Sequence, residues 1–157
     1  MYLELFREGV GCMILLAAIL LFAYVAWVDS KTMEIPDRCH LILLGLAGLQ
    51  MLIDPAIPLV DRGFGLIAIS LPMLFANVVR EESFGGGDIK MCSATGFLLG
   101  ASQMIFGALL ALMLAGLYGG FTLVLKIKKP QDSFALGPFL SLGYVTSILI
   151  GLLKNGV

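Results

Sequence analysis

The chain has 157 residues, of which 59% are hydrophobic and only 13% are charged, with a net charge of −1 and a mean hydropathy of +1.00. A soluble domain of this length needs a far more polar surface, so the composition predicts one compact, all-α integral membrane bundle. The near-zero charge gives no electrostatic footprint for nucleic acid. The single histidine, His40, and three scattered cysteines without a C-x-x-C pair indicate neither a zinc site nor a disulfide framework.

The first half of the chain contains three apolar runs. Residues 11–28 carry no charge and are long enough to cross a bilayer core of about 30 Å. A secretory signal peptide is the alternative, because Arg7 precedes this run, but no convincing cleavage site ends it and further spans follow. Residues 39–53 predict a second, shorter span. Residues 63–79 predict a third, in which Pro72 is expected to kink the helix.

The second half predicts three more spans. Residues 89–101 are short for a span unless the helix starts in the glycine-rich loop that precedes them. Gly96 and Gly100 form a small-xxx-small face, which favours close helix contact inside a bundle. Residues 103–125 and 134–153 predict the fifth and sixth spans, which gives a bundle of about six transmembrane helices.

The positions of the Lys and Arg residues predict the orientation. With six spans, both termini lie on one side of the membrane. The loops of the opposite side carry seven Lys and Arg residues, and the side of the termini carries three. These loops are therefore expected in the cytoplasm and both termini outside; a five-span chain with 89–101 re-entrant would break the separation. The seven are Lys31, Arg38, Arg80, Lys90, Lys126, Lys128 and Lys129, and the three are Arg7, Arg62 and Lys154.

Two aspartates lie where a charge is costly. Asp29 directly follows the first apolar run and Asp88 directly precedes the fourth, in loops on the same predicted side of the membrane. Two carboxyl groups close together cannot both ionise cheaply, so one pKa rises and the pair shares a proton. Such a pair supplies one general base and one general acid. The alternative is that each aspartate only caps a helix, and Asp88 is well placed as an N-cap.

Three consecutive glycines, Gly85, Gly86 and Gly87, precede Asp88. Glycine permits positive φ and the close approach of another chain. We therefore expect a hinge that places Asp88 at the membrane face and leaves room for an extended peptide. A phosphate-binding loop is the competing interpretation, but no G-x-x-x-x-G-K-[ST] pattern is present and no strand is expected before the glycines.

These segments resemble the motifs of the type IV prepilin peptidases, a family of GxGD aspartyl proteases. Residues 85–88 (GGGD) match the GxGD signature and are followed by Ile-Lys, as in that family. Residues 29–37 (DSKTMEIPD) resemble its pattern of an aspartate, a basic turn and Ile-Pro-Asn, with Asp37 in place of the usual Asn. Residues 134–143 (FALGPFLSLG) resemble its Pro-Phe-(Gly/Ala)-Pro-(Phe/Ala)-Leu-x-x-Gly segment without the first Pro.

The resemblance implies an aspartic endopeptidase of the bacterial inner membrane that removes the short basic leader from prepilins or pseudopilins at the cytoplasmic face. It implies that Asp29 and Asp88 activate a water without any cofactor or metal. The partners it implies are the prepilin substrate and the lipid bilayer; the oligomeric state is left open. The active-site loop would contain Gly85, Gly86, Gly87 and Lys90, and the substrate contacts would include Glu34, Ile35, Pro36 and Pro138.

Larger members of this family carry an N-terminal cytoplasmic region with paired C-x-x-C motifs and methylate the new N-terminus. Residues 1–157 contain neither that region nor the cysteine pairs, so a single peptidase domain without N-methyltransferase activity is expected. Charged residues near the aspartates have two expected roles. Cations that could bias the pKa of the pair, or could lie on the path of the leader, are Lys31, Arg38 and Lys90. Acidic residues that could attract a cationic leader are Glu34, Asp37, Glu81 and Glu82.

Two other classes of function remain as alternatives. A small ion- or proton-coupled transporter or channel subunit would use the same two aspartates to bind a cation or relay protons. Their predicted place at the cytoplasmic end argues against this, because transport sites usually lie near the middle of the bilayer. A structural membrane subunit without chemistry is the third class.

Overall fold

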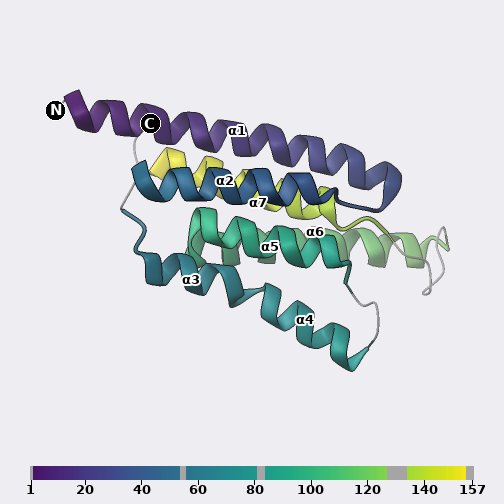
Figure 1. The fold of residues 1–157 in the computed structure, drawn as a ribbon. Coiled ribbons are helices and arrows are strands. Elements are labelled where there is room, and N and C mark those ends of the chain that lie inside the picture. Colours follow the sequence, from purple (N-terminus) through teal and green to yellow (C-terminus); the bar gives the residue numbers. More distant parts are fainter. Residues whose placement is uncertain (1, 54–55, 81–83, 127–133, 155–157) are drawn as a thin grey trace.

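The computed structural model describes residues 2–53, 56–80, 84–126 and 134–154, and every regular element within them is a helix (Figure 1). This confirms the all-α fold class. The helices are α1 (Tyr2–Thr32), α2 (Asp37–Ile53), α3 (Leu59–Ala68), α4 (Ser70–Val79), α5 (Gly86–Leu99), α6 (Ala101–Val124) and α7 (Gly137–Lys154).

The helices form a bundle in which α5 occupies the centre. It packs against α2, α3, α4, α6 and α7, while α1 packs against α2 and α7 (Figure 1). Seven of the 14 residues of α5 are buried. At about 1.5 Å per residue, α5 is about 21 Å long and is too short to cross a bilayer core alone. As expected, this helix starts within the glycine-rich loop, so the loop is a structural part of the central helix.

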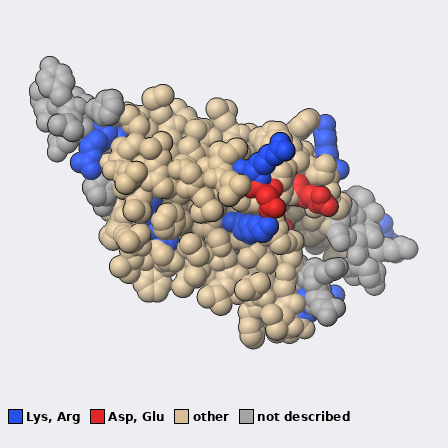
Figure 2. All heavy atoms as spheres, viewed as in Figure 1, with Lys and Arg blue, Asp and Glu red and all other residues tan. Residues whose placement is uncertain are grey.

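The expected spans correspond to α1, α2, α3 with α4, α5, α6 and α7. Four segments are long and apolar enough to cross a membrane: Arg7–Thr32, Leu59–Val79, Ala101–Val124 and Gly137–Lys154. α2 and α5 are shorter, and much of the surface of α5 is covered by its neighbours. On the face drawn in Figure 2, the visible acidic side chains lie towards one end and the middle of the surface is largely uncharged, as suits a lipid-facing belt.

The third expected span is interrupted at Ile69, between α3 and α4. Pro72 explains the position of the break, because proline has no N–H to donate to the carbonyl of Ala68 and its ring clashes with that carbonyl. The hydroxyl of Ser70, next to the break, donates to the carbonyl of Leu66, one turn back. The kink expected from Pro72 is thus present as a break three residues before it.

Close glycine contacts hold α5 against its neighbours. A Cβ at Gly96 would lie 2.0 Å from the carbonyl oxygen of Gly65 on α3, and a Cβ at Gly65 would lie 2.3 Å from that of Gly96. The expected close contact at Gly96 is therefore present. Gly100 also lies close to α3, because a Cβ at Gly65 would lie 2.9 Å from its carbonyl carbon, and its φ of 78° allows the turn from α5 into α6. The buried guanidinium of Arg62 donates to the carbonyls of Phe97 and Leu98, at the C-terminus of α5.

The topology brings the segments of interest to one end of the bundle. Both termini lie at the opposite end (Figure 1). The ends of α1, α4 and α6 and the starts of α2, α5 and α7 therefore meet at the same end, as the six-helix arrangement requires. Asp29 lies in the last turn of α1 and Asp88 in the first turn of α5, so the fold places both in this region.

Candidate active site

Asp29 is held inside the bundle by the start of α7. Its side chain is only 4% exposed, and its Oδ2 accepts a hydrogen bond from the backbone N–H of Gly137 at 2.8 Å. Gly137 is the first residue of α7, where unpaired N–H groups and the helix dipole favour an anion. A Cβ at Gly137 would lie 2.6 Å from the same oxygen, so only glycine allows this approach.

Asp88 is the third residue of α5. The N-cap is Gly85, so the expectation that Asp88 itself is the N-cap is wrong. Its carboxyl group accepts a hydrogen bond from the N–H of Gly85, which is the backward half of a capping box. Its other oxygen, Oδ1, is buried and has no hydrogen-bond partner in the described part of the chain. The Asp88 carboxyl group therefore leaves part of its hydrogen-bonding capacity unused.

One cavity joins the two aspartates. It has a volume of about 420 Å³ and is lined by Asp29, residues 33–37, residues 85–88 and Lys90. Burial, and after it the nearby carboxylate of Asp29, raises the pKa of Asp88 to about 7. Near neutral pH, Asp88 thus carries a proton for much of the time. This arrangement can supply a carboxylate and a carboxylic acid to the same cavity, which is the requirement for general acid–base hydrolysis.

The glycine segment, residues 85–87, differs from the expected hinge. Gly85 has φ −64° and ψ 139°, and Gly86 and Gly87 are already helical, so these glycines do not adopt the positive φ that glycine permits. Close approach does explain Gly87, because a Cβ there would lie 3.1 Å from Cβ of Ile35. Gly85 likewise lies against Asp88, with an added Cβ 3.0 Å from Oδ2. Gly87 therefore lets the first turn of α5 pack against the segment between α1 and α2, and Gly85 leaves room for the Asp88 carboxyl group.

Hydrogen bonds anchor the residue before the glycines. The side-chain amide of Asn77, on α4, donates to the carbonyl of Phe84 at 2.8 Å, and its oxygen accepts the Phe84 N–H at 2.7 Å. A pair of bonds in opposite directions resembles one rung of an antiparallel sheet. The glycine segment is therefore attached to α4 at its start.

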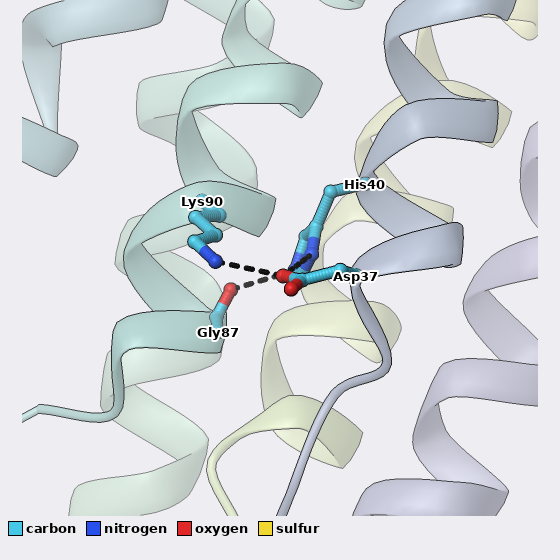
Figure 3. A network of polar contacts seen from close by, with 4 residues as sticks. All are labelled: Asp37, His40, Gly87 and Lys90. Atoms are coloured by element: carbon cyan, nitrogen blue, oxygen red, sulfur yellow. Dashed lines mark hydrogen bonds and ion pairs between the residues drawn. The ribbon is translucent and has the colours of Figure 1, made fainter.

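On its other side, the glycine segment contacts the first turn of α2 (Figure 3). His40 Nε2 lies 2.9 Å from the carbonyl oxygen of Gly87, and Lys90 Nζ lies 2.7 Å from Oδ1 of Asp37. This interaction with Lys90 lowers the pKa of Asp37. Lys90, expected to bias the aspartate pair, has a direct carboxylate partner in Asp37 instead.

The other expected site residues are divided between the cavity and its surroundings. Glu34, Ile35 and Pro36 line the cavity, whereas Pro138 is not among its lining residues. The ammonium group of Lys31 lies 4.2 Å from the ring centre of Trp27, a cation–π contact. Arg38 is exposed in the first turn of α2 and does not line the cavity. Glu81 and Glu82 lie outside the described residues.

Two residues at this site were not predicted from the sequence. Gly137 is the donor to Asp29, and its signal was a glycine before Pro138 at the start of an apolar run, which is typical of a helix N-terminus. His40 bonds to Gly87 across 47 positions, and no local pattern indicates such a contact.

The comparisons with known proteins agree with the motifs. A family model described as the type IV leader peptidase family matches residues 14–120, a range that contains both Asp29 and Asp88. The chain belongs to this family. The family assignment made from the motifs is thereby confirmed. No solved structure shows a significant match to the chain.

Relatives among curated proteins include three named prepilin leader peptidase/N-methyltransferase. The Bacillus subtilis (strain 168) protein is 26% identical, over 83% of this chain and 53% of the relative. The Aeromonas salmonicida (strain A449) protein is 28% identical, over 87% of this chain and 50% of the relative. The Dickeya chrysanthemi protein is also 28% identical, over 95% of this chain and 54% of the relative. The chain spans about half the length of these relatives.

Proposed function

We propose that this chain is an aspartic endopeptidase that removes the short basic leader from type IV prepilins or pseudopilins. The observation that carries the proposal is that Asp29 and Asp88, 59 positions apart, line one cavity at one end of the bundle, in a chain of the type IV leader peptidase family. A cavity at the end of the bundle also speaks against a transport site, which would lie near the middle of the bilayer.

In the proposed mechanism, Asp29 is the ionised member of the pair and Asp88 the protonated one. The hydrogen bond from the N-terminus of α7 favours a carboxylate at Asp29, and the pKa of about 7 favours a proton on Asp88. Asp29 takes a proton from a water, whose oxygen attacks the scissile carbonyl carbon. Asp88 donates its proton to the carbonyl oxygen. In the second step Asp29 returns its proton to the leaving amine, and Asp88 recovers one from the tetrahedral intermediate.

The charges of the cavity suit a cationic leader. Its lining contains four acidic residues, Asp29, Glu34, Asp37 and Asp88, and one cation, Lys90. Glu34 and Asp37 are exposed, so they can meet a basic peptide before it reaches the pair. Residues 33–36 lie beside the glycine segment and are our candidates for contacts with the extended substrate backbone.

The proposed setting is the bacterial cytoplasmic membrane, with the cavity facing the cytoplasm and both termini outside. The excess of Lys and Arg in the loops at the cavity end supports this orientation. We propose residues 1–157 as one peptidase domain. N-methyltransferase activity, part of the relatives' names, is not part of the proposal, because the sequence contains no C-x-x-C pair.

Co-expression with a candidate prepilin in bacterial membranes tests the proposed function. Mass spectrometry of the prepilin reads leader removal directly. We expect cleavage with the native chain and none with Asp29→Asn or Asp88→Asn, because each substitution removes one of the two proton-transfer groups. Thermal unfolding in detergent, followed by the fluorescence of the single tryptophan, checks that both variants still fold. Full cleavage by either variant would rule out the aspartate pair.

A further inference from the structure

His40 is a buried polar residue that no catalytic role explains. It lies in the first turns of α2, is 6% exposed, and places Nε2 2.9 Å from the carbonyl oxygen of Gly87 (Figure 3). A carbonyl oxygen can only accept a hydrogen bond, so Nε2 carries a proton and donates it. Gly87 directly precedes Asp88. The histidine therefore bonds to the backbone of the helical turn that carries a proposed catalytic carboxyl group.

The described surroundings of the His40 ring offer no other hydrogen bond that could replace the bond to Gly87. Beside His40 is an apolar cavity of only about 10 Å³, whose lining includes Phe22, Leu43 and Met91. A water needs about that volume and two to four polar partners, which these side chains do not offer. Nδ1 of His40 is buried without a hydrogen-bond partner among the described residues, at 3.6 Å from Oδ1 of Asp37. The bond to Gly87 is thus the hydrogen bond that offsets the cost of burying the imidazole here.

The neighbouring contact between the same two helices is weaker. The side chains of Lys90 and Asp37 are 59% and 76% exposed, and ion pairs this exposed contribute little. The first turn of α5 also begins with Gly86 and Gly87, which have the largest conformational freedom of any residue and no side chains to pack. A turn of this composition needs an external anchor to hold a fixed position, and the buried bond from His40 is that anchor on the side of α2.

We propose that His40 is a positioning residue that fixes the first turn of α5, and with it the Asp88 carboxyl group relative to Asp29. This inference rests on the proposed peptidase function. Catalytic groups must be held to about 0.5 Å, and a misplacement of about 1 Å can lower the rate about 100-fold. Loss of the bond therefore acts on kcat rather than on substrate binding.

Three substitutions separate the bond from the rest of the side chain. The amide nitrogen of Gln stands as many bonds from Cβ as Nε2, so His40→Gln can still donate to Gly87. His40→Asn places its amide at the position of Nδ1, towards Asp37, and cannot reach Gly87. His40→Leu removes both nitrogens. We expect kcat to fall about 10- to 100-fold in the Asn and Leu variants with KM within about twofold, and kcat of the Gln variant to stay within about threefold of the native value.

Hydrogen exchange read by mass spectrometry tests the same bond without relying on activity. Amides of residues 84–91 should exchange faster in the Asn and Leu variants and at the native rate in the Gln variant. Peptides from α6 and α7 should stay unchanged in all three, which controls for general unfolding. Native exchange and native kcat in His40→Leu, or a Gln variant that behaves like the Asn variant, would overturn the positioning role. If the native chain cleaves no prepilin, the proposed function fails, and the exchange experiment still decides whether His40 anchors the turn.

Discussion

The carboxylate of Asp29 accepts a hydrogen bond from the backbone N–H of Gly137, 108 positions further along the chain, at 2.8 Å. This contact joins the end of α1 to the start of α7. A Cβ at position 137 would meet the Asp29 side chain at 2.6 to 3.0 Å. Gly137→Ala is therefore expected to push Asp29 out of place, lowering prepilin cleavage about 100-fold. The free energy of unfolding should fall by about 1–3 kcal/mol, measured by thermal unfolding in detergent.

Gly45→Ala is the matched control for this substitution. Gly45 lies on α2, and nothing is within 4 Å of an added Cβ. Alanine there should leave cleavage unchanged and raise stability by up to about 1 kcal/mol, since it is the better helix former. Equal cleavage by the native chain and Gly137→Ala would show that this contact does not place Asp29.

Cleavage should depend on the protonation of Asp88, whose pKa is raised to about 7. The proposed acid must carry its proton before the substrate reacts, so activity requires a pH below that value. We expect kcat/KM to be highest at mildly acidic to neutral pH and to fall about tenfold per unit above about pH 7. The measurement is kcat/KM against pH with a prepilin peptide in detergent. Lysines of the leader titrate near 10.4 and do not interfere. A rate that stays constant up to pH 9 would contradict Asp88 as the acid.

Gly96→Ala should destabilise the bundle although alanine is normally favourable in a helix. An added Cβ would lie 2.0 Å from the Gly65 carbonyl oxygen, which is backbone and cannot move aside alone. We expect a loss of about 1–3 kcal/mol in the free energy of unfolding. Gly116→Ala, on α6 with nothing within 4 Å of the added Cβ, should be neutral or gain up to about 1 kcal/mol. Equal stability of the two variants would mean that α3 and α5 do not pack as closely as described.

Asp37→Asn should keep kcat within about threefold of the native value, because the ion pair it removes is exposed and contributes at most about 1 kcal/mol. The amide oxygen of Asn can still accept a hydrogen bond from Lys90. KM for a basic leader should rise by a few-fold at low salt, since one acidic group of the cavity lining is lost. Steady-state kinetics at two salt concentrations checks both values. A large fall in kcat would place Asp37 in the chemistry.

The sequence predicted the helical membrane bundle and the family, because both depend on local patterns. Apolar runs of bilayer length indicate spans wherever the helices pack, and the motifs around residues 29–37 and 85–88 are contiguous stretches. The start of α5 in the glycine segment and an interruption near Pro72 were predicted for the same reason, since proline and helix length act on the backbone locally.

The tertiary structure decided what surrounds the aspartates. The glycines before Asp88 are helical or extended instead of left-handed, and two of them allow close contacts: Gly87 with Ile35 and Gly85 with Asp88. The donor to Asp29 comes from Gly137 and the anchor of Gly87 comes from His40, across 108 and 47 positions. A hydrogen bond between distant segments depends on how whole helices pack, and the sequence around each partner does not indicate it. The sequence therefore identified the two carboxyl groups, and the packing of α1, α2, α5 and α7 determined how each is held.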